Sequence, residues 1–226
     1  MTPNAPAPTP SGEASCDDTP RHGATEPTEG AAGRKRPKPG ERRVQILQAL
    51  ATMLEQPGAE RVTTAALAAR LQVSEAALYR HFASKAQMFE GLIEFIESSV
   101  FGLVQQITQR ETDPRQCAAR LVAMLLQFAE KNPGMVRVMV GDALVFEHER
   151  LQQRMNLFFD KFDAALRQAL REATPASDTP TVDANVLAGV LTAFAVGRLQ
   201  RFARSGFRRA PTEQLDAALA LVLAGV

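Results

Sequence analysis

The chain has 226 residues, of which 45% are apolar, and this is enough to bury a hydrophobic core in one or two domains. A disordered or fibrous class is therefore excluded for the chain as a whole. Lysine and arginine number 26 against 25 acidic residues, so the net charge of +1 alone favours no class of partner. The sequence also has only two cysteines, no signal-peptide pattern and no run of eighteen apolar residues. We expect a soluble cytoplasmic protein that does not bind a membrane.

Residues 1–40 are predicted to form a disordered tail, because they contain eight of the 14 prolines and no Val, Ile, Leu or Phe. Charge changes sign along this part of the chain. Residues 1–33 hold one basic and five acidic residues, whereas residues 34–89 hold ten basic and four acidic ones. Such a basic stretch is typical of a mobile arm that reaches phosphates or a minor groove, and its commoner alternative is a solubilising charge run. The stretch contains Arg34, Lys35, Arg36, Lys38, Arg42 and Arg43.

Four helices are predicted between residues 42 and 109. The first follows a 3.6-residue apolar period and stops at Pro57-Gly58. A short helix over 65–71 follows the N-cap candidates Thr63 and Thr64, and a helix over 75–82 follows Ser74. Ser84 and Gln87 have the spacing of a capping box for the fourth, which runs to about residue 109.

The rest of the chain is also predicted to be helical. Asp113-Pro114 is typical of an N-cap followed by a first turn, for a helix that reaches residue 130. Further helices are expected over 135–139, 142–172, 182–204 and 212–224. Because no segment alternates apolar and polar residues, the chain is predicted to be all-α, with about nine helices.

The helices over 65–71 and 75–82 are joined by a very short turn, which predicts a helix-turn-helix. The outward polar face of its second helix has a size suited to the major groove of DNA, and the alternative is a helical hairpin with a solvated face. We expect base-edge or nearby phosphate contacts from Ser74, Glu75, Ala77, Tyr79, Arg80 and His81. Backbone contacts are expected from Thr63, Thr64 and Lys85, with the arm adding Arg42 and Arg43.

No catalytic or metal constellation is found in the sequence. His148 lies between two glutamates, but neighbouring positions on a helix point apart and no second histidine lies four residues away. There is no glycine-rich phosphate loop and no recognisable nucleophile with its base. We therefore expect a protein that is not an enzyme and needs no cofactor or metal, although a helical enzyme remains the alternative from another class.

The segment SEAALYRHFASKAQMFEGLIEFIE resembles the signature of the TetR family, in which a Tyr-x-His-Phe motif ends the recognition helix and a lysine follows. The matching residues are Tyr79, His81, Phe82 and Lys85. The family often has glycine in the turn where this chain has Gln72, so a left-handed backbone there would cost on the order of 1 kcal/mol. The resemblance implies a helix-turn-helix domain over 41–88 and a helical regulatory and dimerisation domain over 89–226.

A dimer interface is implied for the last two helices. Gly189, Ala193 and Gly197 recur at four-residue spacing, and small residues in one row allow close helix approach. The alternative is an intramolecular core helix. The expected interface residues are Gly189, Ala193, Phe194, Gly197, Leu215, Leu219 and Val222.

Several segments further resemble the nucleoid occlusion branch of the TetR family, namely VTTAALAARLQVSEAALYRHF, LIEFIE, KNPG, ALVFEHERLQQRMN and RFARSGFRRAPTEQLDA. This resemblance implies a nucleoid-associated homodimer that binds palindromic double-stranded DNA and antagonises polymerisation of the tubulin-like FtsZ. It places a partner surface at Phe95, Lys131 and Asn132. Phe95 also belongs to a predicted helix with more apolar residues than one stripe needs. The alternative is a TetR-type repressor released by a small ligand.

Overall fold

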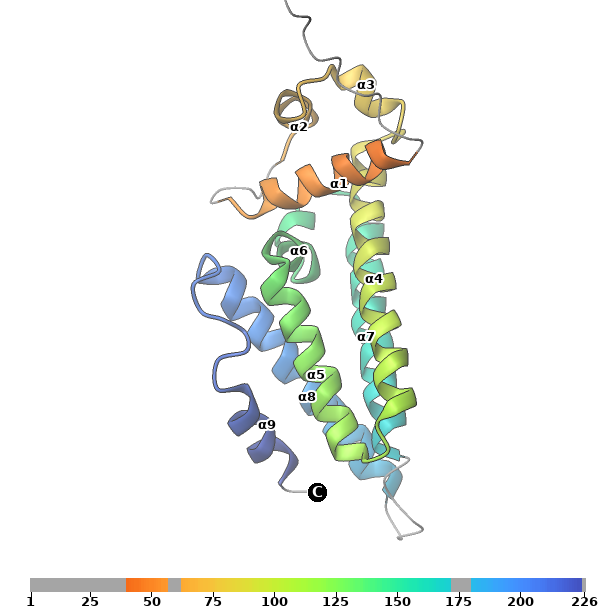
Figure 1. Ribbon diagram of the computed structural model, residues 1–226, viewed down its shortest axis with the longest axis vertical. Coiled ribbons are helices and arrows are strands. Elements are labelled where there is room, and N and C mark those ends of the chain that lie inside the picture. Colours follow the sequence, from red (N-terminus) through yellow and green to blue (C-terminus); the bar gives the residue numbers. More distant parts are fainter. Residues whose placement is uncertain (1–39, 57–61, 172–179, 225–226) are drawn as a thin grey trace, which may run out of the picture. The chain divides into compact units, whose positions relative to one another are not determined.

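A computed structural model describes residues 40–56, 62–171 and 180–224. These residues form α-helices and one short 3-10 helix, with no strand among them, so the prediction of an all-α fold is confirmed. Figure 1 shows the order of the helices, and the predicted N-terminal tail lies outside the described residues. The elements are α1 Glu41–Leu54, α2 Thr64–Arg70, α3 Glu75–Tyr79, α4 Lys85–Arg110, α5 Pro114–Lys131, α6 Pro133–Met139, the 3-10 helix η2 Asp142–Leu144, α7 Glu149–Arg171, α8 Pro180–Arg204 and α9 Leu215–Leu223.

The predicted N-caps explain where four of these helices begin. Thr63 accepts a hydrogen bond from the backbone N–H of Ala66, at 3.2 Å, ahead of α2. Ser74, Ser84 and Asp113 do the same for α3, α4 and α5. Each side-chain oxygen pairs one of the first-turn N–H groups that have no partner inside the helix.

Two predicted helix starts are wrong, and a left-handed residue explains each. The helix expected from Asp142 begins instead at Glu149, because Gly141, with φ 86°, leads into the 3-10 helix η2 and a turn. The last helix begins at Leu215 rather than Thr212, because Gln214 has φ 50°. The third predicted helix also ends early, at Tyr79 instead of Phe82.

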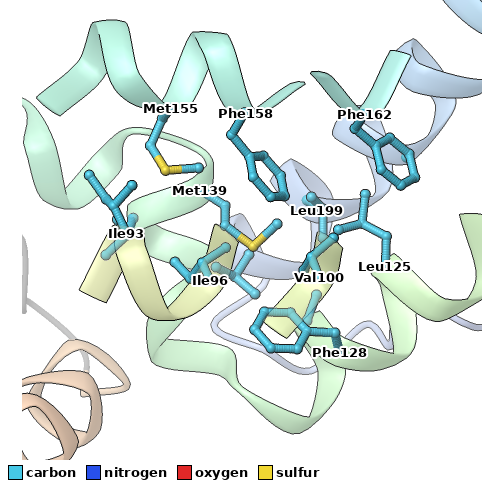
Figure 2. Packing of buried hydrophobic residues seen from close by; sticks show 14 of the residues in the cluster. Ile93, Ile96, Val100, Leu125, Phe128, Met139, Met155, Phe158, Phe162 and Leu199 are labelled. Carbon is cyan, nitrogen blue, oxygen red and sulfur yellow. The ribbon is translucent and has the colours of Figure 1, made fainter. Parts of the chain in front are cut away.

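The hydrophobic core lies mainly among α4, α5, α7 and α8 (Figure 2). Four core side chains, Leu125, Phe128, Phe158 and Phe162, are buried and fill the space between the middle helices. The ring of Phe158 lies 5.4 Å from that of Phe101, centroid to centroid. Burying each such ring contributes on the order of 2 kcal/mol, so this packing dominates the stability of the body.

Helix α6 joins the first helix to the body by direct backbone contact. A Cβ atom at Gly134 would lie 1.9 Å from the carbonyl oxygen of Ala51 in α1, so only glycine allows this approach. On its other side α6 contacts α8. There the guanidinium of Arg137 is buried over the ring of Phe207, 5.2 Å from its centroid.

Helix α4 runs unbroken through the predicted domain boundary at residues 88 and 89. Its 26 residues contact α1 at one end and α5 and α7 along the rest. An ion pair of 2.5 Å between Arg154 on α7 and Glu97 on α4 ties the two helices together. The hydrogen bond to Glu97 raises the pKa of the Arg154 guanidinium above its ordinary value.

One helix in the described part of the chain, over Ala184–Arg204, is long and apolar enough to cross a membrane by length and composition. Its buried residues Leu187, Leu191 and Leu199 pack in the protein core. Core helices of soluble proteins have the same composition, so this feature alone does not indicate a membrane span. It does mean that α8 carries more apolar surface than its own chain covers.

Candidate nucleic-acid interface

Helices α2 and α3 form a helix-turn-helix whose turn has left-handed backbone at Gln72, with φ 54°. The expected left-handed backbone is therefore present, and two backbone hydrogen bonds stabilise the turn. Gln72 N–H donates to the carbonyl of Ala69 and Val73 N–H to that of Ala68, both at 3.0 Å. Thr64 at the start of α2 donates a hydrogen bond of 2.6 Å to the Glu75 carboxylate at the start of α3. These contacts fix how the two helices cross.

A small hydrophobic core lies beneath these contacts. Leu67, Leu78 and Phe82 are at most 1% exposed, while Leu71 and Val73 are half-buried. This packing holds the short helix α3, which has only five residues and too few internal hydrogen bonds to be stable alone.

The face of α3 that points away from this core is polar and accessible. Ser74, Glu75 and Arg80 are exposed, and Tyr79 exposes 44% of its surface. Ala77 and His81 are half-buried at the edge of this face. On α2, Thr63 is exposed, and the exposed Arg70 in its last turn adds a positive charge that sequence reasoning missed. A basic residue in the last turn of a predicted helix was the available signal.

The two arginines of α1 already have partners within the protein. Arg43 donates a hydrogen bond of 2.5 Å to the carbonyl of His81, and its guanidinium lies 4.1 Å from the centre of the Phe82 ring. Arg42 donates to Gln45 within α1, at 2.9 Å. Arg43 therefore supports α3 in this conformation, and a phosphate contact would require its side chain to move.

Lys85 begins α4, where the sequence predicts a phosphate contact, and it is paired with a carboxylate in this structure. Its Nζ lies 2.5 Å from Oε1 of Glu147, in the turn before α7, and 5.7 Å from the centre of the Phe89 ring. The Glu147 side chain is only 10% exposed and that of Lys85 27%. A DNA phosphate and Glu147 would thus compete for the same ammonium group.

The residues expected to bind the division protein lie on α4 and on the end of α5. Phe95 is 47% exposed, an unusual position for a phenylalanine, and Leu103 on the same helix is 38% exposed. Lys131 is exposed at the end of α5. Asn132 is half-buried, and its side-chain amide donates a hydrogen bond of 2.7 Å to the carbonyl of Phe128, which ends the helix.

The residues expected at the dimer interface divide into two groups. Gly189 and Ala193 are exposed on α8, where a Cβ added at Gly189 would meet nothing within 4 Å. Phe194, Gly197 and Val222 are half-buried. Leu215 and Leu219 are instead covered by their own chain, because α9 packs on α5. Three further apolar side chains on these two helices are exposed, namely Val186, Val190 and Leu221.

Metal chemistry finds no support in the described ranges, where no three His, Cys, Asp or Glu side chains gather as ligands. His148 has a local role: its Nδ1 accepts a hydrogen bond of 3.2 Å from the backbone N–H of Arg150 in the first turn of α7.

Helix-turn-helix helices that lead into a helical body are the architecture of TetR-type regulators, and the comparisons agree. Residues 46–92 match the family of bacterial regulatory proteins, tetR family, and residues 116–224 match the tetracyclin repressor-like C-terminal domain of the SlmA-like type. The regulator PfmR from Thermus thermophilus has the same fold, with a TM-score of 0.65 and 20% identity over 80% of this chain and 98% of that one. FadR from Bacillus subtilis, solved with stearoyl-CoA, gives a TM-score of 0.62 and 12% identity over 81% of this chain and 98% of its own.

Sequence similarity is much higher to one group within this class. The nucleoid occlusion factor SlmA of Idiomarina loihiensis is 49% identical over 177 residues, which are 78% of this chain and 90% of that protein. SlmA of Vibrio cholerae is 49% identical over 187 residues, which are 82% and 95% of the two chains. The chain belongs to the SlmA family of TetR-type DNA-binding proteins.

Proposed function

We propose that this protein is a nucleoid occlusion factor, which binds palindromic sites on the chromosome as a dimer and there inhibits assembly of FtsZ into a division ring. The observation that carries the proposal is the 49% identity to nucleoid occlusion factors over nine tenths of their length. That similarity includes both the helix-turn-helix and the body, so it favours the function of the whole relative over that of a DNA-binding domain joined to an unrelated body.

The DNA-binding part of the proposal assigns roles by position. Ser74, Glu75, Ala77, Tyr79, Arg80 and His81 lie on or beside the accessible side of α3 and would read base edges or neighbouring phosphates. Thr63, Thr64 and Lys85, at helix starts around it, would hold the backbone. Arg42 and Arg43 would act from α1 only after leaving their present partners.

The dimer part of the proposal uses the outer face of α8. Val186, Gly189, Val190 and Ala193 form an exposed apolar stripe of small and β-branched residues, which favours close packing against a second copy. A two-fold dimer presents two copies of α3, and a palindrome offers two equivalent half-sites, so the symmetry of the protein matches that of the site.

A repressor released by a small ligand would need an enclosed space among its middle helices. In this structure the side chains of Leu125, Phe128, Phe158 and Phe162 occupy that region, as Figure 2 shows. The packing there favours signalling through the surface, although an open hollow lined by Val104, Cys117 and Ala169 lies between α4, α5 and α7, and the fold is shared with regulators such as FadR, which was solved with stearoyl-CoA.

The proposal is tested by polymerising purified FtsZ with GTP and this protein, with and without a DNA fragment that the protein binds. We expect light scattering to fall in the presence of the bound fragment and to fall much less with a scrambled fragment. Chromosome-wide occupancy gives a second readout, with many palindromes spread over the chromosome and few near the terminus. Unchanged scattering together with one occupied site beside the protein's own gene would instead establish a local repressor.

A further inference from the structure

Four arginines gather where α8 ends and the chain turns toward α9. Residues 201–210, RFARSGFRRA, contain Arg201, Arg204, Arg208 and Arg209 and no acidic residue. All four are exposed, and none forms an ion pair with a carboxylate of the described residues. They line one shallow hollow together with Ser205. We name residues 201–210, which carry these four arginines, the arginine loop.

The arginine loop is held in a fixed, strained conformation. Gly206 and Phe207 both have φ 62°, which is rare for a phenylalanine. Phe207 is held by a 3.0 Å hydrogen bond from its N–H to the carbonyl of Phe202 and by an edge contact of the two rings, 5.1 Å apart. Ser205 Oγ accepts from the backbone N–H groups of Arg208 and Arg209, at 3.1 and 2.9 Å. Strain of this kind persists only where surrounding contacts enforce it, and it is concentrated at functional positions.

A fifth arginine shows what a structural arginine looks like at this place. Arg198 donates from Nη1 to the carbonyls of Pro211 and Glu213, at 3.1 and 2.5 Å, and stacks over the Phe194 ring, 4.7 Å from its centre. The four arginines of the arginine loop lack such a full set of partners. Arg208 uses only Nε, which donates to the Ser205 carbonyl at 3.0 Å, so its two terminal nitrogens have no protein acceptor among the described residues.

The arginine loop is connected to the end of α5. Thr212, just beyond the loop, donates a hydrogen bond to the carboxylate of Glu130, which is the neighbour of Lys131 in sequence. A second hollow lies between α5 and this segment, and it is lined by Ala123, Gln127, Thr212, Gln214, Leu215, Asp216 and Ala217. The hydrogen bond therefore places the segment after the arginine loop beside the end of α5, where Glu130 and Asp216 are acidic.

We propose that the arginine loop binds the carboxylates of an acidic peptide, namely the disordered tail of the division partner, and that this tail extends onto the loop from the surface around Phe95 and Lys131. The proposal rests on the proposed function and supplies what that surface lacks. Among its other exposed positions Leu103 and Gln127 are uncharged, and Glu94 and Glu130 are acidic. Guanidinium groups suit this ligand, because each can bind a carboxylate with two parallel hydrogen bonds.

DNA is the other polyanion to consider, and the arrangement disfavours it. Figure 1 shows the segment between α8 and α9 on the other side of α1 from α2 and α3. A duplex held in its major groove by α3 therefore lies away from the arginine loop.

The test measures binding of a fluorescent synthetic peptide of the acidic FtsZ tail to the full-length protein by anisotropy. In the first variant, Arg208→Glu and Arg209→Glu are combined. The matched control has the same charge change and combines Arg110→Glu with Arg115→Glu. Both arginines are exposed; Arg110 is the last residue of α4, and Arg115 lies in the first turn of α5. We expect the first variant to weaken binding by about tenfold or more and the control to change it little. Operator binding should be unchanged in both variants.

Two further measurements separate the possible failures. A peptide whose Asp and Glu are replaced by Asn and Gln should bind the unaltered protein weakly, and the variant Arg208→Lys with Arg209→Lys should bind the acidic peptide with intermediate strength. Equal binding by the parent and the glutamate variant overturns the arginine-loop proposal but leaves the proposed function intact. Loss of operator binding with unchanged peptide binding assigns the loop to DNA and also overturns it. No peptide binding and no inhibition of FtsZ by the parent overturns both proposals.

Discussion

Lys85, for which we propose a phosphate contact, is joined to the body of the protein by an ion pair. Its ammonium group is held by Glu147, which comes from a segment 62 positions later in the sequence. In the absence of DNA this pair neutralises a charge that a phosphate would otherwise meet directly. If Lys85 contacts a phosphate, it must exchange one anionic partner for another, so its net contribution to DNA affinity is smaller than that of an unpaired lysine.

The first prediction follows from this exchange. The variant Glu147→Gln should bind all DNA sequences more tightly, by up to about fivefold, because a partly exposed ion pair is worth at most about 1 kcal/mol. The variant Lys85→Ala should weaken all sequences alike and reduce the salt dependence by about one phosphate contact. Fluorescence anisotropy at several salt concentrations measures both. If Glu147→Gln binds no more tightly while Lys85→Ala loses affinity, the pair does not oppose DNA.

Single residues also mark how far sequence reasoning reaches. The N-caps Thr63, Ser74, Ser84 and Asp113 were predictable because capping is local, with oxygen and N–H only two or three residues apart. The Lys85 partner was not, because nothing local specifies a contact across 62 residues. The partner of Arg43 was not predictable either, because its contact with the His81 carbonyl depends on how α1 packs on the helix-turn-helix. The sequence alone suggested that Arg43 faces a phosphate.

At the scale of elements, α6 controls how closely the first helix approaches the body. We predict that Gly134→Ala destabilises the protein by about 1–3 kcal/mol, because its methyl group would overlap the Ala51 carbonyl and push α1 and α6 apart. Chemical denaturation measures the change in the free energy of unfolding. Gly102→Ala is the matched control, since a Cβ there meets nothing within 4 Å and alanine favours the helix. Equal effects of the two substitutions would contradict the close contact.

Helix α8 carries the prediction for the dimer. The variant Val190→Asp places a charge on the exposed stripe and should shift the protein to monomers in analytical ultracentrifugation. Affinity for a full palindrome should then fall toward that for a half-site. Val145→Asp, a similar change at a valine that is 69% exposed outside α8, should remain dimeric. A dimeric Val190→Asp protein would move the interface away from this face.

The helix boundaries show why periodicity alone was not enough. Apolar spacing predicted the long helices well, since α4, α5 and α8 end within one or two residues of the expected positions. It failed before α7 and α9, where Gly141 and Gln214 adopt positive φ without an obvious turn sequence. It also could not distinguish the two sides of the last helix, because Leu215 and Leu219 meet α5 in a contact that only tertiary packing decides.

For the whole molecule, we propose that the basic residues ahead of α1 act as an arm that binds DNA. Deletion of residues 1–39 removes Arg34, Lys35, Arg36 and Lys38 and leaves α1, which begins at Glu41, complete. We predict that this deletion lowers DNA affinity and flattens its salt dependence, while deletion of residues 1–33 changes neither by much. Dimerisation should be unchanged in both proteins. Equal affinity of the two truncated proteins at low salt would show that the arm does not contact DNA.

The continuity of α4 has a thermodynamic consequence for the two proposed binding events. Lys85 opens the helix and Phe95 follows ten residues later, about 15 Å along the same rod. A ligand at either position that shifts this rod changes the affinity of the other by the same factor, because linkage is reciprocal. If operator DNA raises the affinity of the protein for FtsZ, then FtsZ must raise its affinity for operator DNA by the same factor. A dividing cell would thereby have more of the protein bound at those chromosomal sites that FtsZ has reached.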